Sequence, residues 1–254
     1  MNTVARRQKL IQQLELEGSV SIVEQAGALG VSSMTVRRDL AKLAEEGMVT
    51  LGHGGATLNK GALFERNMAI KQGQHRLEKE KIARAAIEYI EDGDSIFLDA
   101  GTTVCEIAKL LVNRRDIVVL TNSLLVANVL SSSESIRQIM CPGTFRARSM
   151  CYIGQSTSEF VTRYKVDVCF LSAAGVDLAK GVSVPDEVDG ATKRAVALHA
   201  EKTICVADSS KFGKTLFYNV CSLDDIDVLV TDDCLSEGEL RQFRKSRVNV
   251  VIAS

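Results

Sequence analysis

Apolar positions along the chain change their spacing near residue 58. Before that point they recur at helical intervals and end in a short β-like run and a glycine-rich stretch. After residue 77, continuous apolar runs alternate with stretches of helical period, which is typical of a parallel sheet covered on both faces. The pattern predicts an α/β protein with a small N-terminal domain over residues 1–58, a linker over 59–76 and a larger α/β domain over 77–254.

In the larger domain the predicted strands and helices alternate. The predicted strands are Ser95–Leu98, Ile117–Leu120, Arg137–Cys141, Val166–Ala173, Thr203–Ala207, Val228–Thr231 and Val248–Ile252. The predicted helices are Leu77–Ile90, Val104–Leu111, Leu124–Leu130, Ala191–Ala200 and Glu237–Lys245. Because loops at the carboxyl ends of parallel strands converge on one crevice, we expect any ligand of this domain to bind there.

The N-terminal domain carries the signals of a helix-turn-helix in the right order. Ser21 and Glu24 have the spacing of a capping box, so a helix is expected to begin there. Gly30 can adopt the left-handed conformation that turns the chain. Ser32 can then cap a second helix, which is expected to run to about Glu46.

The second helix of this motif is predicted to have a buried and a basic face. At about 100° per residue, Val36, Leu40 and Leu43 fall on one narrow stripe, which must be core. Arg38 lies nearly opposite, in the half of a recognition helix that reaches base edges. An arginine can hold guanine O6 and N7 with two hydrogen bonds, and arginine or lysine can hold a phosphate.

After Gly47, a β-run followed by a glycine-rich turn fits a wing that lies along the DNA. The candidate DNA-contacting residues of the helix and wing are Ser32, Ser33, Met34, Thr35, Arg37, Arg38, Lys42, His53, Gly54 and Gly55.

Charge alone does not decide whether the protein binds DNA. The formal net charge is −1, so DNA contact must come from a local patch rather than from a global positive field. Residues 1–58 hold six Lys or Arg and six Asp or Glu, so two arginines on a helix also fit an ordinary solvated face. The capping signals and the phase of Arg38 favour DNA binding over that alternative.

Four loops of the larger domain combine glycine, hydroxyl and charged residues directly after predicted strands. Gly101 and two threonines precede a helix, as in sites where backbone N–H groups and hydroxyls hold an anion. Asp99 and Asp177 suit sugar hydroxyls, and Lys211 adds a cation for a phosphate. Each residue type is also common in turns and caps, but four such loops in one sheet favour a ligand site. The candidate ligand residues of these loops are Asp99, Gly101, Thr102, Thr103, Thr121, Asn122, Ser123, Gly175, Asp177 and Lys211.

The remaining composition argues against other classes of protein. The seven cysteines are widely spaced and include no Cys-x-x-Cys pair, so we interpret them as buried reduced thiols and expect no disulfide, metal site or cofactor. Residues 1–18 contain no apolar segment of a signal peptide. No apolar run approaches the roughly 20 residues of a membrane span. We therefore expect a cytoplasmic protein without a membrane partner.

Several segments resemble the DeoR family of bacterial regulators. The family's helix-turn-helix motif is matched by Val31-Ser32-Ser33-Met34-Thr35-Val36-Arg37-Arg38-Asp39-Leu40, followed by His53-Gly54-Gly55-Ala56. The family's sensor motifs are matched by Asp99-Ala100-Gly101-Thr102-Thr103, Thr121-Asn122-Ser123, Gly175-Val176-Asp177 and Asp208-Ser209-Ser210-Lys211-Phe212-Gly213. The chain departs from the family pattern at Gln25, where leucine is usual, at Leu51, where arginine is usual, and at Pro142, where glycine is frequent.

The resemblance covers nearly the whole chain and implies a function. It implies a winged helix-turn-helix domain that binds double-stranded operator DNA. It implies a sensor domain, similar in fold to ribose-5-phosphate isomerase, that binds a phosphorylated sugar or related metabolite. A repressor of a sugar catabolic operon, released by that effector and assembled into homo-oligomers (dimers or tetramers), is the expectation. The resemblance also adds Lys193 to the ligand candidates.

Two other functions stay open. A phosphosugar isomerase on this fold would need a carboxylate base near the sugar carbon. Leu178 follows Asp177 where the similar isomerases have a second acid, so we assign no catalytic residue and do not expect an enzyme. In the other alternative, the larger domain of a DNA-binding protein binds no ligand and only oligomerises.

Overall fold

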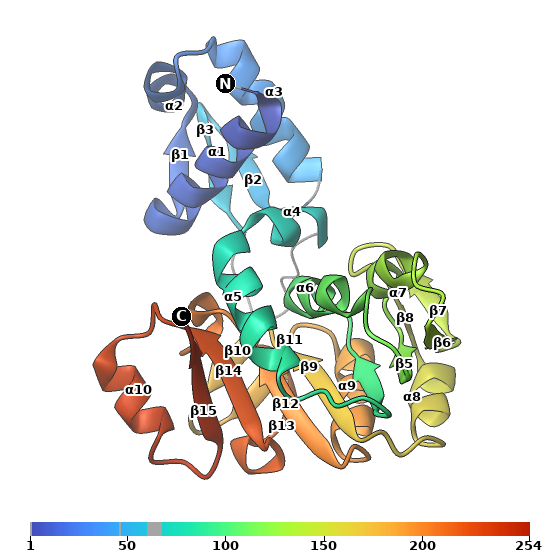
Figure 1. The fold of residues 1–254 in the computed structure, drawn as a ribbon. Helices are drawn as coiled ribbons and strands as arrows, with labels where there is room; N and C mark the ends of the chain where they lie inside the picture. Colours follow the sequence, from blue (N-terminus) through green and yellow to red (C-terminus); the bar gives the residue numbers. More distant parts are fainter. Residues whose placement is uncertain (1, 46, 60–67) are drawn as a thin grey trace. The chain divides into compact units, whose positions relative to one another are not determined.

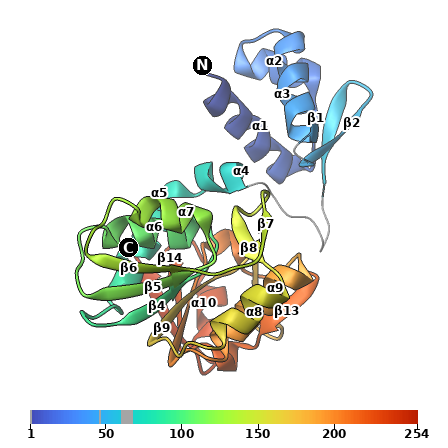
Figure 2. The same cartoon turned by 90° about the vertical axis from the view of Figure 1, so that its right-hand side faces the viewer.

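The computed structural model describes residues 2–45, 47–59 and 68–254, and the chain divides into two compact units, Met1–Gln74 and His75–Ser254 (Figures 1 and 2). The division falls inside the predicted linker, 59–76. Residues 60–67 of that linker lie outside the described residues. Met68–Gly73 forms helix α4, which the sequence pattern missed because a helix this short has no sustained period.

The first unit contains a helix-turn-helix followed by a wing. Its further elements are α1 (Thr3–Glu17), β1 (Ser19–Ser21), α2 (Ile22–Leu29), α3 (Ser33–Glu45), β2 (Val49–Gly52) and β3 (Gly55–Leu58). Strand β3 pairs antiparallel with both β1 and β2. Gly30 ends α2 in the left-handed conformation, with φ 63°, as predicted. The predicted core stripe of α3 is confirmed, since Val36, Leu40 and Leu43 are all buried.

The second unit is built on a seven-stranded parallel sheet with the order β15-β14-β12-β9-β4-β5-β6. Its helices are α5 (Arg76–Ile87), α6 (Thr102–Leu111), α7 (Leu124–Leu130), α8 (Gln155–Val161), α9 (Glu187–Ala197) and α10 (Glu237–Phe243), with short 3-10 helices η1 (Ser209–Lys211) and η2 (Leu223–Asp225). The strands of the large sheet are β4 (Ser95–Leu98), β5 (Ile117–Thr121), β6 (Ile136–Met140), β9 (Val168–Ser172), β12 (Lys202–Val206), β14 (Val228–Asp232) and β15 (Asn249–Ala253).

Both faces of the large sheet are covered, which explains its continuous apolar strands. In β4, Ile96 and Leu98 join a core cluster with residues of α5, α6 and α7, whereas Phe97 joins a second cluster with residues of α8, α9 and α10. Figure 1 shows α5 and α6 on the near face and α9 behind the strands. An α/β fold with a parallel sheet is therefore confirmed.

Several small elements were missed by the sequence prediction. Strands β10 (Gly175–Asp177), β11 (Gly181–Val184) and β13 (Tyr218–Cys221) form an antiparallel sheet, and β7 (Thr144–Arg146) pairs with β8 (Cys151–Ile153). These strands are three or four residues long, too short for an alternating pattern to be recognised. The predicted helix Ala191–Ala200 begins earlier, at Glu187, because the Asp186 side chain accepts a hydrogen bond from the Asp189 N–H at 2.9 Å and caps it.

The cysteines are free thiols, and all but one are buried. Burial raises the pKa of the Cys141 thiol to about 12, which suits an unreactive thiol. Cys234 contradicts the interpretation of buried thiols, because it lies exposed in the turn that follows β14. In the described part of the chain, no helix combines the length and apolarity that a membrane span requires.

Candidate DNA-reading face and candidate ligand site

The exposed face of α3 presents two arginines and a methionine. Arg37 and Arg38 are exposed, and the Met34 side chain is 63% exposed. Ser32, in contrast, serves the local structure, because its Oγ accepts a hydrogen bond from the Thr35 N–H at 3.2 Å and lies 2.9 Å from the Thr35 hydroxyl. The helix thus turns a basic surface away from its own core, as a recognition helix requires.

Lys42 lies further along the same helix and already has an anionic partner. Its Nζ is 2.9 Å from a carboxylate oxygen of Glu45, and both side chains are at least half exposed. An exposed pair of this kind is weak, and contact of Lys42 with DNA stays a prediction.

The wing is a tight hairpin in which β2 and β3 are joined by His53 and Gly54. Gly54 has φ 78°, and its carbonyl accepts a hydrogen bond from the Ile22 N–H at 2.8 Å. A side chain on Gly55 would place its Cβ 2.2 Å from the Val20 carbonyl oxygen, so the fold itself requires this glycine. Leu51, which replaces the arginine usual in the family, is 47% exposed on β2.

The ligand candidates that follow β4 lie where the chain reverses the direction in which it adds strands to the sheet. The chain runs from β4 outward to β5 and β6, and then continues on the other side of β4 with β9. The carboxyl ends of β4 and β9 therefore flank a topological switch point, where open α/β sheets bind their ligands. Asp99 follows β4 directly, and Ser172 is the last residue of β9.

Asp99, Ser172 and Lys193 form a buried polar cluster at this point. The Asp99 Oδ2 atom accepts hydrogen bonds from the Ser172 N–H at 2.8 Å, from the Ser172 hydroxyl at 2.7 Å and from the Lys193 ammonium. The ammonium also donates to the Ser172 hydroxyl at 2.9 Å and lies 3.8 Å from Asp189. Burial by itself lowers the pKa of Lys193, but Asp189 and Asp99 outweigh it, so the pKa is raised and the lysine stays charged.

This cluster changes the interpretation of Lys193 and Asp99. Lys193 is 2% exposed, and its charge is balanced by two carboxylates. Its first role is therefore to stabilise the buried cluster, rather than to present a positive charge to a ligand. The other carboxylate oxygen of Asp99, the buried Oδ1, has no hydrogen-bond partner among the described residues. Ser172 and Asp189 were missed in the sequence, although Asp189 lies one helical turn before Lys193.

The N-terminus of α6 opens at the same switch point. Gly101, the residue before the helix, makes no side-chain cap, so the first N–H groups of the helix are left for another acceptor. A Cβ on Gly101 would lie 2.5 Å from the Ser172 Cβ, which explains the glycine. Thr102 and Thr103 are buried in the first turn.

The next loop uses its hydroxyls internally. The Thr121 hydroxyl donates to the Leu98 carbonyl at 2.6 Å, and the Ser123 hydroxyl caps α7 by accepting from the Val126 N–H at 3.3 Å. Asn122 donates from its amide to the Tyr152 carbonyl at 3.2 Å. Its buried Oδ1 has no partner among the residues that the structure describes, so Asn122 is the member of this loop with an acceptor to offer.

The third candidate loop is a structural hairpin. Asp177 ends β10, and its Oδ1 accepts from the Ala179 and Lys180 N–H groups, both at 2.9 Å, to form the turn into β11. A Cβ on Gly175 would lie 2.5 Å from the Lys214 carbonyl oxygen, so that glycine permits close packing. The structure thus gives both residues local roles, and their contact with a ligand stays a prediction.

Lys211 lies on the loop that follows β12. Its Nζ is 3.5 Å from Asp208 and 3.2 Å from the Ser210 hydroxyl, and its side chain is 26% exposed. Burial by itself raises the pKa of the Asp208 carboxyl, but Lys211 and the Ser210 hydroxyl lower it by a larger amount, so the pKa is lowered overall. Strand β9 separates β12 from β4, so Lys211 and the α6 N-terminus follow strands roughly 10 Å apart.

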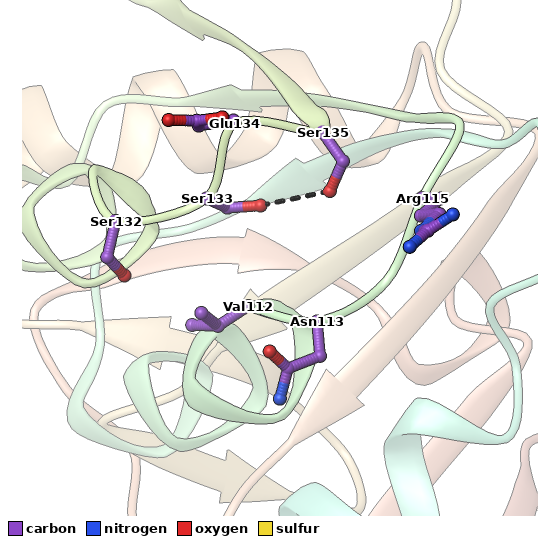
Figure 3. Close-up of a pocket in the computed structure, with 7 residues that line it drawn as sticks. All are labelled: Val112, Asn113, Arg115, Ser132, Ser133, Glu134 and Ser135. Carbon is purple, nitrogen blue, oxygen red and sulfur yellow. Dashed lines mark hydrogen bonds between the residues drawn. The ribbon is translucent and has the colours of Figure 1, made fainter.

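Two other features contain none of the candidate ligand residues. A shallow surface hollow of about 450 Å³ is lined by residues that precede β5 and β6, at the opposite edge of the sheet (Figure 3). Asp232, Asp233 and Cys234 come close enough to share a metal ion. Both Asp232 oxygens, however, accept backbone hydrogen bonds, one of them from the Ser209 N–H, and Asp233 pairs with Lys81 at 3.0 Å, so these carboxylates already serve the local structure.

Comparison with known proteins assigns a family to both units. A family model described as a DeoR-like helix-turn-helix domain matches residues 6–62, and one described as the DeoR C terminal sensor domain matches residues 74–233. The chain is 34% identical over 232 residues to the glycerol-3-phosphate regulon repressor of Escherichia coli (strain K12), covering 91% of this chain and 92% of that protein. It is 31% identical over 251 residues to the HTH-type transcriptional regulator IolR of Bacillus subtilis (strain 168), covering 98% of each.

The solved structures that align with the chain are more distant than these relatives. A ribose 5-phosphate isomerase A from Methanocaldococcus jannaschii aligns with TM-score 0.40 and 19% identity over 53% of each chain. The eIF2B delta subunit from Chaetomium thermophilum aligns with TM-score 0.45 and 16% identity, covering 61% of this chain and 56% of that one.

Proposed function

Because the chain belongs to the DeoR family of transcriptional regulators, we propose that it is a repressor that binds operator DNA and releases it when a phosphorylated sugar or related metabolite binds. The observation that carries the DNA-binding part is the exposed basic face of α3, next to a hairpin wing, within the matched helix-turn-helix segment. We infer that Arg38 contacts a base edge and that Arg37, Lys42 and the His53 turn hold the backbone.

The ligand part of the proposal rests on the switch point between β4 and β9. Uncapped N–H groups at the start of α6 suit a phosphate, and the free acceptors Asp99 Oδ1 and Asn122 Oδ1 suit hydroxyl donors. A group that donates hydroxyls and carries a phosphate has the chemistry of a sugar or polyol phosphate. The relative that is named a glycerol-3-phosphate regulon repressor supports this class without fixing the compound.

We propose further that the protein is not an enzyme. An isomerase needs a carboxylate that is free to move a proton at the sugar carbon. Asp99 is bound to Lys193, and the Asp177 carboxylate is held by two backbone N–H groups, so neither is arranged as a free base. The relatives are named as regulators and repressors, which supports the same conclusion.

The proposed mode of action includes assembly and location. A winged helix reads one half-site, so a homodimer or homotetramer would read an operator with two half-sites at fixed spacing. A repressor of this kind acts where the chromosome is, and we therefore place it in the bacterial cytoplasm.

The proposal is tested with the full-length chain and DNA. A duplex recovered from a random-sequence pool by the wild-type chain serves as operator, and a scrambled duplex of the same length serves as control. We expect fluorescence anisotropy to show tight binding of the selected duplex, weakened by one member of a sugar phosphate panel and not by inorganic phosphate. Failure to enrich any sequence contradicts DNA reading. Enrichment without an effect of any sugar phosphate contradicts the sensor, whereas turnover of a sugar phosphate favours the isomerase.

A further inference from the structure

Helix α3 contains a buried carboxylate, Asp39, directly beside the exposed Arg38. Asp39 follows Arg38 in the sequence but falls on the core side of α3 with Val36 and Leu40, and it is 2% exposed. An isolated buried carboxylate is strongly disfavoured, so its place in the core stripe requires compensation from other groups.

Two arginines of α1 supply that compensation. Arg6 Nε lies 2.6 Å from Asp39 Oδ2, and Arg7 Nε lies 3.0 Å from Asp39 Oδ1. Each carboxylate oxygen thus accepts a charge-assisted hydrogen bond from a different arginine. The Arg6 side chain is 11% exposed and that of Arg7 31%, so the contact with Arg6 is nearly removed from water.

This contact differs from the rest of the packing in α1 and α3. Among the residues of the two helices whose burial is described, the other buried ones, such as Leu10, Leu14 and Leu43, are apolar. Apolar contacts are non-directional and tolerate small rotations of one helix against another. Two hydrogen bonds to fixed oxygens tolerate much less, and buried polar contacts can set the register of helices for that reason.

We propose that Asp39 is a positioning residue for DNA reading: by binding Arg6 and Arg7 it sets the rotation of α3 and thereby the aim of Arg37 and Arg38. The inference rests on the proposed DNA-binding function and adds the way in which the reading face is held. Asp39 itself touches no base in this scheme and acts through its neighbours on α3.

General electrostatics makes the opposite prediction for the key variant. Asp39→Asn removes a negative charge from a DNA-binding domain, which by charge alone would tighten binding to any duplex. If Asp39 positions α3, the same substitution weakens binding to the operator, because Arg37 and Arg38 would no longer be oriented toward the DNA and would lose their contacts. The ratio of operator affinity to scrambled-duplex affinity therefore separates the two effects.

The experiment measures this ratio for full-length wild type and Asp39→Asn, at a temperature where circular dichroism shows both to be folded. The probes are the duplex selected by the wild-type chain and its scrambled counterpart. We expect the ratio to fall about tenfold or more for Asp39→Asn, with unchanged or tighter binding of the scrambled duplex. An unchanged ratio overturns the inference alone. A wild-type chain that selects no sequence overturns the proposed function and this inference with it.

Two further variants complete the test. Glu17→Gln makes the same change of charge at an exposed position of α1 and should leave the ratio unchanged. If Asp39→Asn fails to fold, Arg7→Gln takes its place, because it removes the more exposed partner and keeps the bond from Arg6. The ratio is then expected to fall although Arg7 lies outside the reading helix, and an unchanged ratio for folded Arg7→Gln overturns the inference.

Discussion

Arg38 and Asp39 are adjacent in the sequence, yet the helix turns them into opposite environments. Arg38 is exposed, while Asp39 is buried against two arginines of α1. The motif that contains both residues therefore combines a surface function with an internal one. Two candidate ligand residues differ in the same way: Lys193 is buried in contact with Asp99, whereas Lys211 is partly exposed.

Arg38→Ala should weaken operator binding without affecting the fold. Loss of one bidentate base contact costs about 1–3 kcal/mol of binding free energy. Because the side chain is exposed, the thermal unfolding midpoint should stay close to that of wild type. Anisotropy titration with the selected duplex and a thermal melt measure the two quantities. Unchanged operator affinity would show that Arg38 is only a solvated side chain.

Lys193→Met should destabilise the second unit in a pH-dependent way. The variant leaves Asp99 and Asp189 buried without their counter-charge, a loss of about 3–5 kcal/mol in the free energy of unfolding at neutral pH. The pKa of Lys193 is raised in the fold, so its contribution is complete below about pH 10.4, the ordinary lysine value, and is lost as pH rises through the higher folded value.

Urea unfolding of wild type and variant across this pH range measures the difference. We expect a constant difference from neutral pH to about pH 10 and a smaller one above it. Lys165→Met removes a lysine from an exposed pair with Glu201 and should change stability little at any pH. A difference that already shrinks between neutral pH and about pH 9 would contradict the raised pKa.

At the scale of elements, close packing explains glycines that the sequence suggested as binding residues. Gly101 lets α6 begin against Ser172, and Gly55 lets β3 pass the Val20 carbonyl. The glycines of these loops are therefore required, in the first place, for close packing. Its consequence for ligands is indirect, since backbone N–H groups without a side chain over them can approach an anion.

Gly55→Ala should destabilise the wing, whereas Gly52→Ala should not. The new Cβ at position 55 would lie 2.2 Å from a backbone oxygen of β1, which cannot move as a side chain can. Gly52 faces Gly55 across the hairpin and has no atom within 4 Å of its added Cβ. We expect a loss of about 1–3 kcal/mol in the free energy of unfolding for Gly55→Ala, measured by denaturant titration. Equal stability of the two variants would contradict the packing argument.

At the scale of the whole molecule, the proposed reading face and the proposed ligand site belong to different compact units. In the proposed function, an effector would influence DNA binding through a change in how half-site readers are placed in an oligomer. Thermodynamic linkage then requires that DNA and effector oppose each other reciprocally, with a coupling free energy of typically 1–3 kcal/mol.

Lys211→Ala should give a repressor that binds the selected duplex normally but ignores the effector. The lysine is partly exposed at the carboxyl edge of the sheet, and its removal leaves the DNA-reading unit untouched. Operator affinity with and without a saturating sugar phosphate measures the response. Lys214→Ala, which removes an exposed lysine three positions further on, should respond like wild type. A normal response of Lys211→Ala would leave this lysine with a local role, such as its contact with Asp208, and would contradict its role in binding the effector.

The sequence by itself determined the local elements, because caps, glycine turns and apolar period act over a few residues. It predicted the helix-turn-helix, the core stripe with Val36 and the long strands of the parallel sheet, all of which the structure confirms. The family resemblance rested on the same contiguous motifs and was confirmed by both family models.

Only the tertiary structure decided which distant residues meet. Asp39 contacts Arg7 from 32 positions away, and Lys193 contacts Asp99 from 94. No local pattern encodes such pairs, since they depend on the order in which strands and helices pack. The same order placed the switch point between β4 and β9, and it made Lys193, whose contact with a ligand stays a prediction, the buried partner of two carboxylates. The charge of a buried group has meaning only through its neighbours, and the fold chooses those neighbours.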